Sequence, residues 1–169
     1  MLTSLNGSVQ RAATFDATGR YRYSLSRRWQ TDGAAVVFIM LNPSRADAEQ
    51  DDPTIRACLQ FAQRWGYGGL QVVNLFGYRT PTPKALATVA DPVGDGCDRA
   101  ILSAAATTDR IILAWGNWGS LWGRDQAVLA QLTPHAHKLH SLGINQSQQP
   151  RHPLYIKRTT LPVRWSSIR

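Results

Sequence analysis

The apolar run at residues 34–41 (Ala-Ala-Val-Val-Phe-Ile-Met-Leu) constrains the fold of this chain more than any other feature of its sequence. A run of this length is too short to cross a bilayer. A strand that is buried on both faces has this composition, whereas a strand with one wet face alternates apolar and polar residues. Such strands occur in parallel sheets that are covered by helices, so the run predicts an α/β fold.

Three more segments resemble buried strands, at residues 70–75, 110–115 and 137–142. Helices are expected between them at about residues 53–65, 95–107 and 124–132, the first with Asp52 as its N-cap and Gly66 as its stop. Residues 12–16 and 21–29 predict an N-terminal β-hairpin, whose second strand alternates so that Tyr21, Tyr23 and Leu25 share one face. Residues 143–169 show no periodicity. We expect one domain over residues 1–169: a three-layer α/β sandwich with a mainly parallel, four-stranded central sheet and an N-terminal hairpin.

Composition limits the setting in which the chain works. Its 169 residues, 43% hydrophobic and 18% charged, suit one globular domain. Cys58 and Cys97 lie far apart and form no CxxC motif, so we expect two buried thiols and neither a metal site nor redox chemistry. No secretory signal is visible in residues 1–9 and no segment could span a membrane, which predicts a cytoplasmic protein. The sequence has no Gly-rich phosphate loop, no GxSxG elbow and no HExxH motif, and no cofactor is expected.

The net charge of +8 comes mainly from arginine, which supplies 16 of the 19 basic residues. Arginine suits phosphate and stacks on bases, so DNA or a nucleotide is the expected partner. A high-GC genome would enrich arginine without any such role. Residues 136–169 carry no Asp or Glu, which makes Arg151, Lys157 and Arg158 candidate contacts to nucleic acid. A second basic stretch contains Arg20, Arg22, Arg27 and Arg28.

Polar or aromatic residues follow all four expected core strands, and ligands of open parallel sheets bind beyond the carboxyl ends of the strands. The candidate ligand contacts are Asn42, Pro43, Ser44, Asp51, Asn74, Phe76, Arg79, Trp115, Asn117 and His152. Other roles remain open for several of them. Asn42 could cap a turn, Asn74 could bond to backbone groups, and capping of the next helix explains at least one of Asp51 and Asp52.

The chain resembles a bacterial and phage family, the domain-of-unknown-function family 1643. The resemblance rests on Met-Leu-Asn-Pro-Ser-x-Ala-Asp-x-x-x-x-Asp-Pro-Thr (residues 40–54), Arg-Trp-Gly-Tyr-Gly-Gly-Leu-x-Val-Val-Asn-Leu-Phe-x-Tyr-Arg (64–79), Ala-Trp-Gly (114–116) and Arg-His-Pro-Leu-Tyr (151–155). It covers nearly the whole chain and implies no established activity.

A more distant resemblance, to the uracil-DNA glycosylase superfamily, implies a fold of that type and a chemistry. In that superfamily, an Asn after the first strand positions the attacking water, as Asn42 would here. A second Asn reads the base edge, as Asn74 would, and a late His-Pro pair, here His152-Pro153, donates to the developing base anion. This chain departs from the pattern with Met40 in place of a Gly and Leu154 in place of a Ser.

The resemblance therefore implies a DNA glycosylase-like hydrolase that acts on an unusual or modified base and needs no metal. Asn42 and His152 would be its catalytic residues, and Leu154 would contact the nucleic acid. Phe76, Trp115 or Trp118 would stack on the base. A non-catalytic nucleic-acid-binding module and an enzyme for a small nucleotide or nucleoside are the alternatives.

Overall fold

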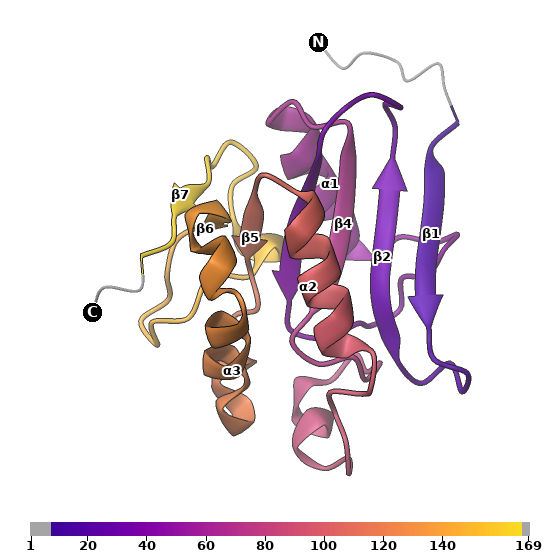
Figure 1. The fold of residues 1–169 in the computed structure, drawn as a ribbon, viewed down its shortest axis with the longest axis vertical. Coiled ribbons are helices and arrows are strands. Elements are labelled where there is room, and N and C mark those ends of the chain that lie inside the picture. Colours follow the sequence, from indigo (N-terminus) through magenta and orange to yellow (C-terminus); the bar gives the residue numbers. More distant parts are fainter. Residues whose placement is uncertain (1–7, 167–169) are drawn as a thin grey trace.

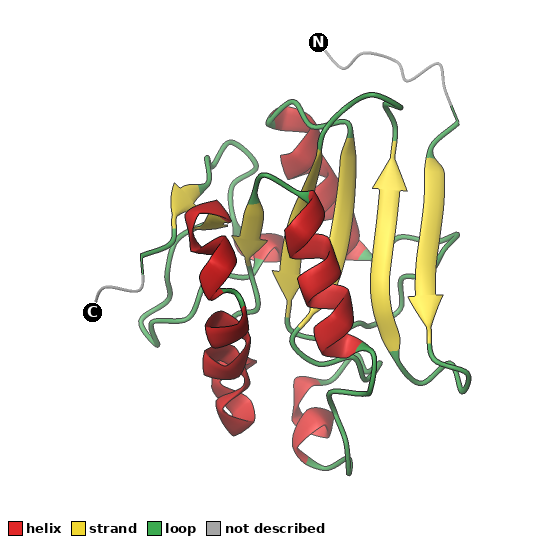
Figure 2. Cartoon of the chain, viewed as in Figure 1, coloured by secondary structure: helices red, strands yellow, loops and turns green. Residues whose placement is uncertain are grey.

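A computed structural model describes residues 8–166 of the chain as one twisted sheet with helices on both faces (Figures 1 and 2). The strands are β1 (Gln10–Phe15), β2 (Arg22–Arg28), β3 (Ala35–Met40), β4 (Gly69–Asn74), β5 (Ile111–Leu113), β6 (Leu139–Ser141) and β7 (Val163–Arg164). The α-helices are α1 (Pro53–Arg64), α2 (Cys97–Thr107) and α3 (Arg124–Gln131). Short 3-10 turns are η1 (Pro83–Ala87), η2 (Asn117–Gly123), η3 (Thr133–Lys138) and η4 (Pro153–Tyr155).

The sheet has the strand order β1-β2-β4-β3-β5-β6-β7. The pairs β3–β4, β3–β5 and β5–β6 are parallel, so the four predicted core strands are mutually parallel, as expected. The sheet is nevertheless larger than the predicted four strands. The hairpin joins it because β2 pairs antiparallel with the edge of β4, and β7 adds a further antiparallel strand beside β6.

The apolar run at residues 34–41 forms the centre of the sheet, because β3 lies between β4 and β5. Phe38 and Met40 pack in the cluster beneath α1, whereas Val37 and Ile39 pack in the cluster beneath α2 and α3. Figure 1 shows α2 and α3 in front of the sheet and α1 behind it. Each such buried side chain contributes roughly 1.5–3 kcal/mol to folding. The two-sided burial predicted from the run is therefore confirmed.

Local signals set the ends of the helices. Asp52 caps α1, since its Oδ1 accepts a hydrogen bond of 2.9 Å from the backbone N–H of Ile55. Gly66 follows α1 at a φ of +84°, a conformation that suits glycine. The predicted strand at residues 137–142 is shorter than expected, because Thr133–Lys138 forms η3 and leaves only Leu139–Ser141 in the sheet.

A β-bulge corrects the predicted alternation of the second hairpin strand. Thr14 pairs with Ser24 and Phe15 pairs with Arg22, so Tyr23 is an extra residue in β2. A bulge of this kind re-aims the neighbouring side chains. Tyr23 therefore packs against the cluster beneath α2, whereas Leu25 belongs to the cluster beneath α1. Arg22, expected on a polar face, is only 2% exposed.

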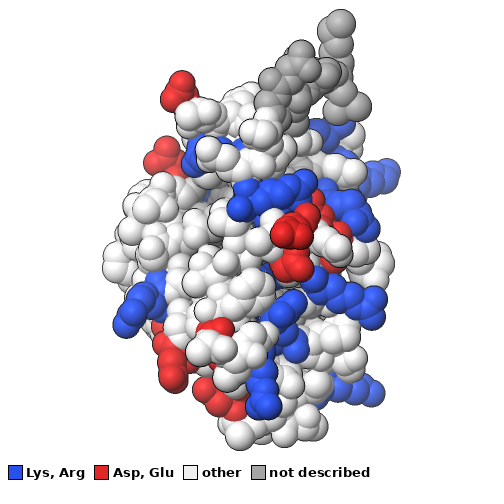
Figure 3. All heavy atoms as spheres, turned by 90° about the vertical axis from the view of Figure 1, so that its right-hand side faces the viewer, with Lys and Arg blue, Asp and Glu red and all other residues white. Residues whose placement is uncertain are grey.

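The hairpin side of the molecule is rich in basic side chains. Figure 3 shows Lys and Arg gathered on the face at the β1 edge, around a smaller acidic group. Two members of the predicted basic stretch there are structural. Arg27 is buried and pairs with Asp51 at 2.9 Å, and Arg28 donates to the carbonyl oxygen of Gly33 at 2.7 Å.

Candidate functional site

A cavity of about 210 Å³ opens at the carboxyl edge of the sheet, where β3 and β4 end beside the start of α1. Its walls come from β2, β3, β4, α1, the loop after β4 and the segment before η4. The lining residues are Arg22, Met40, Leu41, Asn42, Ser44, Asp52, Thr54, Ile55, Val72, Asn74, Thr80, Pro81, Pro83 and His152. Asn42, Asn74 and His152 thus line one cavity, although they lie far apart in sequence.

Asn74 is the last residue of β4 and is 2% exposed. Neither its side-chain nitrogen nor its side-chain oxygen has a hydrogen-bond partner within residues 8–166. The large majority of buried side-chain polar atoms are paired in folded proteins, so an amide left open on both sides is rare. One of the two readings left open by the sequence is therefore excluded: backbone groups do not satisfy this amide. It presents an NH₂ donor group and an acceptor oxygen to whatever enters the cavity.

Arg22 reaches the cavity because the bulge in β2 turns it toward α1. Its Nη1 donates to the carbonyl oxygen of Ala46 at 2.6 Å, and its buried Nε has no acceptor among the described residues. Burial lowers the pKa of Arg22 to about 10, while the carboxylate of Asp52 opposes that shift, so the guanidinium is charged at neutral pH. Strict alternation assigned Arg22 to a polar face, and a bulge leaves no clear signal in a sequence.

Asp52 supplies a carboxylate to the same cavity. Its Oδ1 caps α1 and its Oδ2 accepts from the backbone N–H of Ala46 at 3.4 Å. These two bonds fix the orientation of the carboxylate while each oxygen keeps further acceptor capacity. The sequence predicted the capping role, and the structure adds that Asp52 is the acidic residue of the cavity wall.

His152 precedes η4, and its Nδ1 accepts a hydrogen bond of 3.2 Å from the backbone N–H of Leu154. The proton of the neutral ring therefore belongs on Nε2. Burial lowers the pKa of His152, and the charge of Asp52 opposes this only in part. A neutral imidazole with an Nε2–H donor is thus the form present at pH 7.

Asn42 is held by the loop around it. Its side-chain nitrogen donates to the carbonyl oxygens of Pro43 at 2.9 Å and Thr80 at 2.8 Å. The turn-capping role that the sequence left open is therefore real, and the side-chain oxygen is the atom of Asn42 that remains for a ligand. Ser44, two residues later, also lines the cavity, whereas the buried Pro43 supports the loop behind it.

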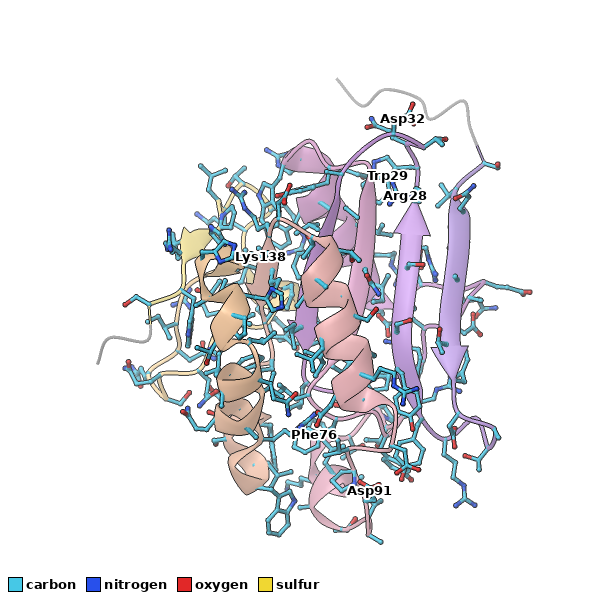
Figure 4. All side chains as sticks on the ribbon, viewed as in Figure 1. Arg28, Trp29, Asp32, Phe76, Asp91 and Lys138 are labelled. Atoms are coloured by element: carbon cyan, nitrogen blue, oxygen red, sulfur yellow. The ribbon has the colours of Figure 1, made fainter. Side chains whose placement is uncertain are left out.

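Six of the ten predicted ligand contacts do not line this cavity: Pro43, Asp51, Phe76, Arg79, Trp115 and Asn117. Asp51 pairs with Arg27 instead. Phe76 is fully buried in the cluster beneath α2 and lies near the lower end of the sheet in Figure 4, opposite the end that carries Arg28 and Trp29. Neither Phe76 nor Trp115 forms an aromatic wall, because both pack in the cluster on the opposite face of the sheet. The pleat places Trp115 in line with Ile111 and Leu113, whereas Phe76 lies past the end of β4, where the regular alternation has stopped.

Trp115 and Asn117 have structural partners of their own. The indole nitrogen of Trp115 donates to Oε1 of Gln149 at 2.7 Å, which ties the end of β5 to the loop after β6. The side-chain oxygen of Asn117 accepts from Asn145 and Ser147, at 2.9 and 2.6 Å. Arg79, also predicted as a ligand contact, lines a neighbouring hollow.

The predicted basic contacts of the last segment fall into two groups. Arg151 and Lys157 are exposed. Arg158 instead lies over the ring of Phe61, at 5.2 Å, and its Nη1 donates to the carbonyl oxygens of Pro153 and Ile156. It therefore fastens the segment that carries His152 to α1. Leu154 is half-buried, and its N–H orients the imidazole.

Comparison with known proteins identifies the family of the chain. A family model described as "Protein of unknown function (DUF1643)" matches residues 22–154. The chain belongs to this family. The DUF1643 match runs from Arg22 to just past His152, so it contains all the described residues that line the cavity. No curated protein and no solved structure matches the chain, and the resemblance to uracil-DNA glycosylases stays a prediction.

Three further observations apply to residues 8–166 of this DUF1643 protein. No helix there is long and apolar enough to span a membrane. No three side chains of His, Cys, Asp or Glu come together there in an arrangement that could hold a metal ion. Cys58 and Cys97 are buried free thiols, as predicted, and burial raises the pKa of Cys97 to about 11.

Proposed function

We propose that this protein is a DNA glycosylase-like hydrolase, which holds an unusual or modified base in the cavity and cleaves its N-glycosidic bond. The open amide of Asn74 carries this proposal, because a buried side chain with a free donor beside a free acceptor suits the edge of a nucleobase. An Asn amide pairs with two neighbouring atoms of a base at once, as in its bidentate contacts to adenine.

The size and walls of the cavity suit one base. Its volume of about 210 Å³ equals that of roughly seven water molecules in the liquid. Met40, Ile55 and Val72 provide apolar walls, while the polar groups are few and fixed in place. A base would have to leave the helical stack to reach such a site, at a cost of a few kcal/mol, which favours bases that pair poorly.

The charged and polar groups of the cavity match the charges that develop in the reaction. As the bond from C1′ to the base nitrogen breaks, its electron pair moves to the base, which becomes anionic. The Nε2–H of His152 and the guanidinium of Arg22 stabilise that anion. Asp52 stabilises the positive charge on the sugar and accepts the proton of the water whose oxygen bonds to C1′. The side-chain oxygen of Asn42 orients that water.

The test is release of free bases from DNA. Single- and double-stranded oligonucleotides that each carry a different modified base are incubated with the protein. Mass spectrometry detects the free base, and alkaline cleavage detects the abasic site. We expect release from at least one substrate. Asn74→Ala and His152→Ala should reduce it by about 10²-fold or more, and Gln63→Ala, an exposed change on α1, should leave it unchanged.

Other results would select the alternatives. Binding that depends on Asn74 but yields no free base from any substrate would refute hydrolysis and indicate a binding module. Release from free nucleosides or nucleotides but not from DNA would indicate a small-molecule enzyme. Unchanged release in the Asn74 and His152 variants would remove both residues from the mechanism.

A further inference from the structure

A second hollow, of about 360 Å³, adjoins the cavity at the carboxyl edge of the sheet. It lies where the β1–β2 turn meets the loops that follow β3 and β4. Ser44, Thr80 and Pro81 line both spaces, so the two lie side by side and share a wall. Its walls carry Arg20, Arg45 and Arg79, and no Asp or Glu of the described chain is among its lining residues.

Arg79 is held in place at the base of this hollow. Its guanidinium carbon lies 4.9 Å from the ring centroid of Phe15, and its Nη1 donates to the carbonyl oxygen of Gly19 at 3.2 Å. Its Nε is buried and has no acceptor within residues 8–166. The cation is thus oriented before any ligand arrives, which lowers the entropy lost on binding.

The positive charges at this edge repel one another. Arg79 lies close enough to the buried Arg22 to help lower the pKa of Arg22. Arg20 and Arg45 add two exposed guanidinium groups at the mouth of the hollow. A concave surface lined by like charges concentrates counter-ions of the opposite sign, and arginine forks match the oxygens of phosphate.

We propose that this hollow, which we call the arginine hollow, binds the phosphate attached to the nucleoside whose base occupies the cavity. The inference rests on the proposed function for the identity of that base, but the hollow itself is a separate site. The phosphate is held by Arg79 and by the two exposed arginines, with Ser44 between it and the base. The nucleic-acid backbone therefore passes over the hairpin turn.

The experiment measures the affinity for a single-stranded DNA oligonucleotide at several salt concentrations. Arg20→Gln combined with Arg45→Gln removes the two exposed charges of the hollow and spares the packed Arg79. Arg64→Gln combined with Arg164→Gln is the matched control: the same loss of charge from exposed residues on α1 and β7. Each lost phosphate contact reduces the magnitude of the negative slope of log K against log salt by about 0.7 for single strands.

We call the Arg20→Gln, Arg45→Gln protein the hollow variant. We expect it to bind the oligonucleotide about tenfold more weakly at low salt, and we expect the magnitude of its salt slope to decrease by about 1.4. The control variant should change little. A second arm compares a nucleoside with its 5′- and 3′-monophosphates. If the wild type binds a monophosphate more tightly than the nucleoside and the hollow variant does not, the hollow also binds the phosphate of a free nucleotide. The oligonucleotide measurement shows whether it also binds a phosphodiester.

Two results would overturn the proposal. One is a hollow variant that binds every phosphate-bearing probe as the control does. The other is a wild-type protein that binds neither the oligonucleotide nor the monophosphates at low salt. Asn74→Ala separates this outcome from failure of the proposed function: it should abolish the preference among bases and leave the salt slope intact. If Asn74→Ala loses the preference among bases but the hollow variant binds as the control does, phosphate binding in the arginine hollow is refuted and the proposed function is not.

Discussion

Replacing Asn74 with leucine should stabilise the ligand-free protein while abolishing ligand binding. Leucine has nearly the shape of asparagine, so Asn74→Leu leaves no large cavity behind. The change removes a buried amide whose donor and acceptor are both unpaired. Each such group costs roughly 1–3 kcal/mol when it is buried without a partner.

Water that enters the cavity recovers part of that cost, so we expect the free energy of unfolding to rise by about 1–2 kcal/mol. For a chain of this length, that gain raises the melting temperature by roughly 2–8 °C. Asn42→Leu is the matched comparison. Its amide donates to two backbone carbonyls, so the same substitution there should destabilise the protein by about 1–3 kcal/mol.

Urea denaturation followed by tryptophan fluorescence measures both variants against the wild type. A substitution that stabilises the folded protein and abolishes its activity identifies a residue that serves ligand binding at the expense of stability. If Asn74→Leu destabilises the protein as much as Asn42→Leu does, the Asn74 amide is satisfied in the folded protein. Asn74 is then not a base-recognition residue.

Three other changes test separate parts of the structure. Because burial lowers the pKa of His152 below its ordinary 6.5, the unfolded chain takes up that proton first as the pH falls. The contribution of the neutral His152 side chain to the free energy of unfolding is therefore present above pH 6.5 and lost below it. Urea titrations at pH 7.5 and 5.5 should show that the stability of His152→Gln depends less on pH than that of the wild type. Arg158→Met removes hydrogen bonds to the backbone of the segment at Pro153, so it should lower the free energy of unfolding by about 1–2 kcal/mol and weaken base release; equal stability and activity would contradict that anchoring role. Gly119→Ala would press a methyl group into the buried indole of Trp115, and calorimetry should show a loss of about 1–3 kcal/mol rather than an unchanged melting temperature.

Periodicity and topology together determined most of the fold and the location of the cavity. The apolar runs identified the four parallel strands because full burial on both faces requires them. The rule that ligands bind beyond the carboxyl ends of parallel strands then identified three of the lining residues, Asn42, Asn74 and His152. Asp52 was recognised as a cap, but a cap gives no sign that the same carboxylate also faces a cavity.

The errors have identifiable physical causes. Trp115 and Phe76 follow strand ends as the ligand contacts do, yet both pack in the core beneath α2 and α3. The pleat accounts for Trp115, whereas Phe76 leaves the face of Asn74 because the alternation stops where β4 ends. Arg22 was missed because one extra residue in β2 reverses the face on which it lies. Arg158 was read as a free cation, whereas its position over Phe61 depends on a contact between segments far apart in sequence.

The place of β2 in the sheet also affects how the protein is made. β2 pairs with β4 and not with β3, which follows it directly in the chain, so Leu25 meets Val72 across a long intervening segment. Such a non-local pairing forms slowly, since the loop must close before any contact compensates for the lost entropy. On the ribosome, the hairpin emerges well before its docking edge has been synthesised. Arg22 is therefore synthesised before β4 but reaches its final position only after β4 has been made, so the cavity that Arg22 lines is completed after both elements have been synthesised.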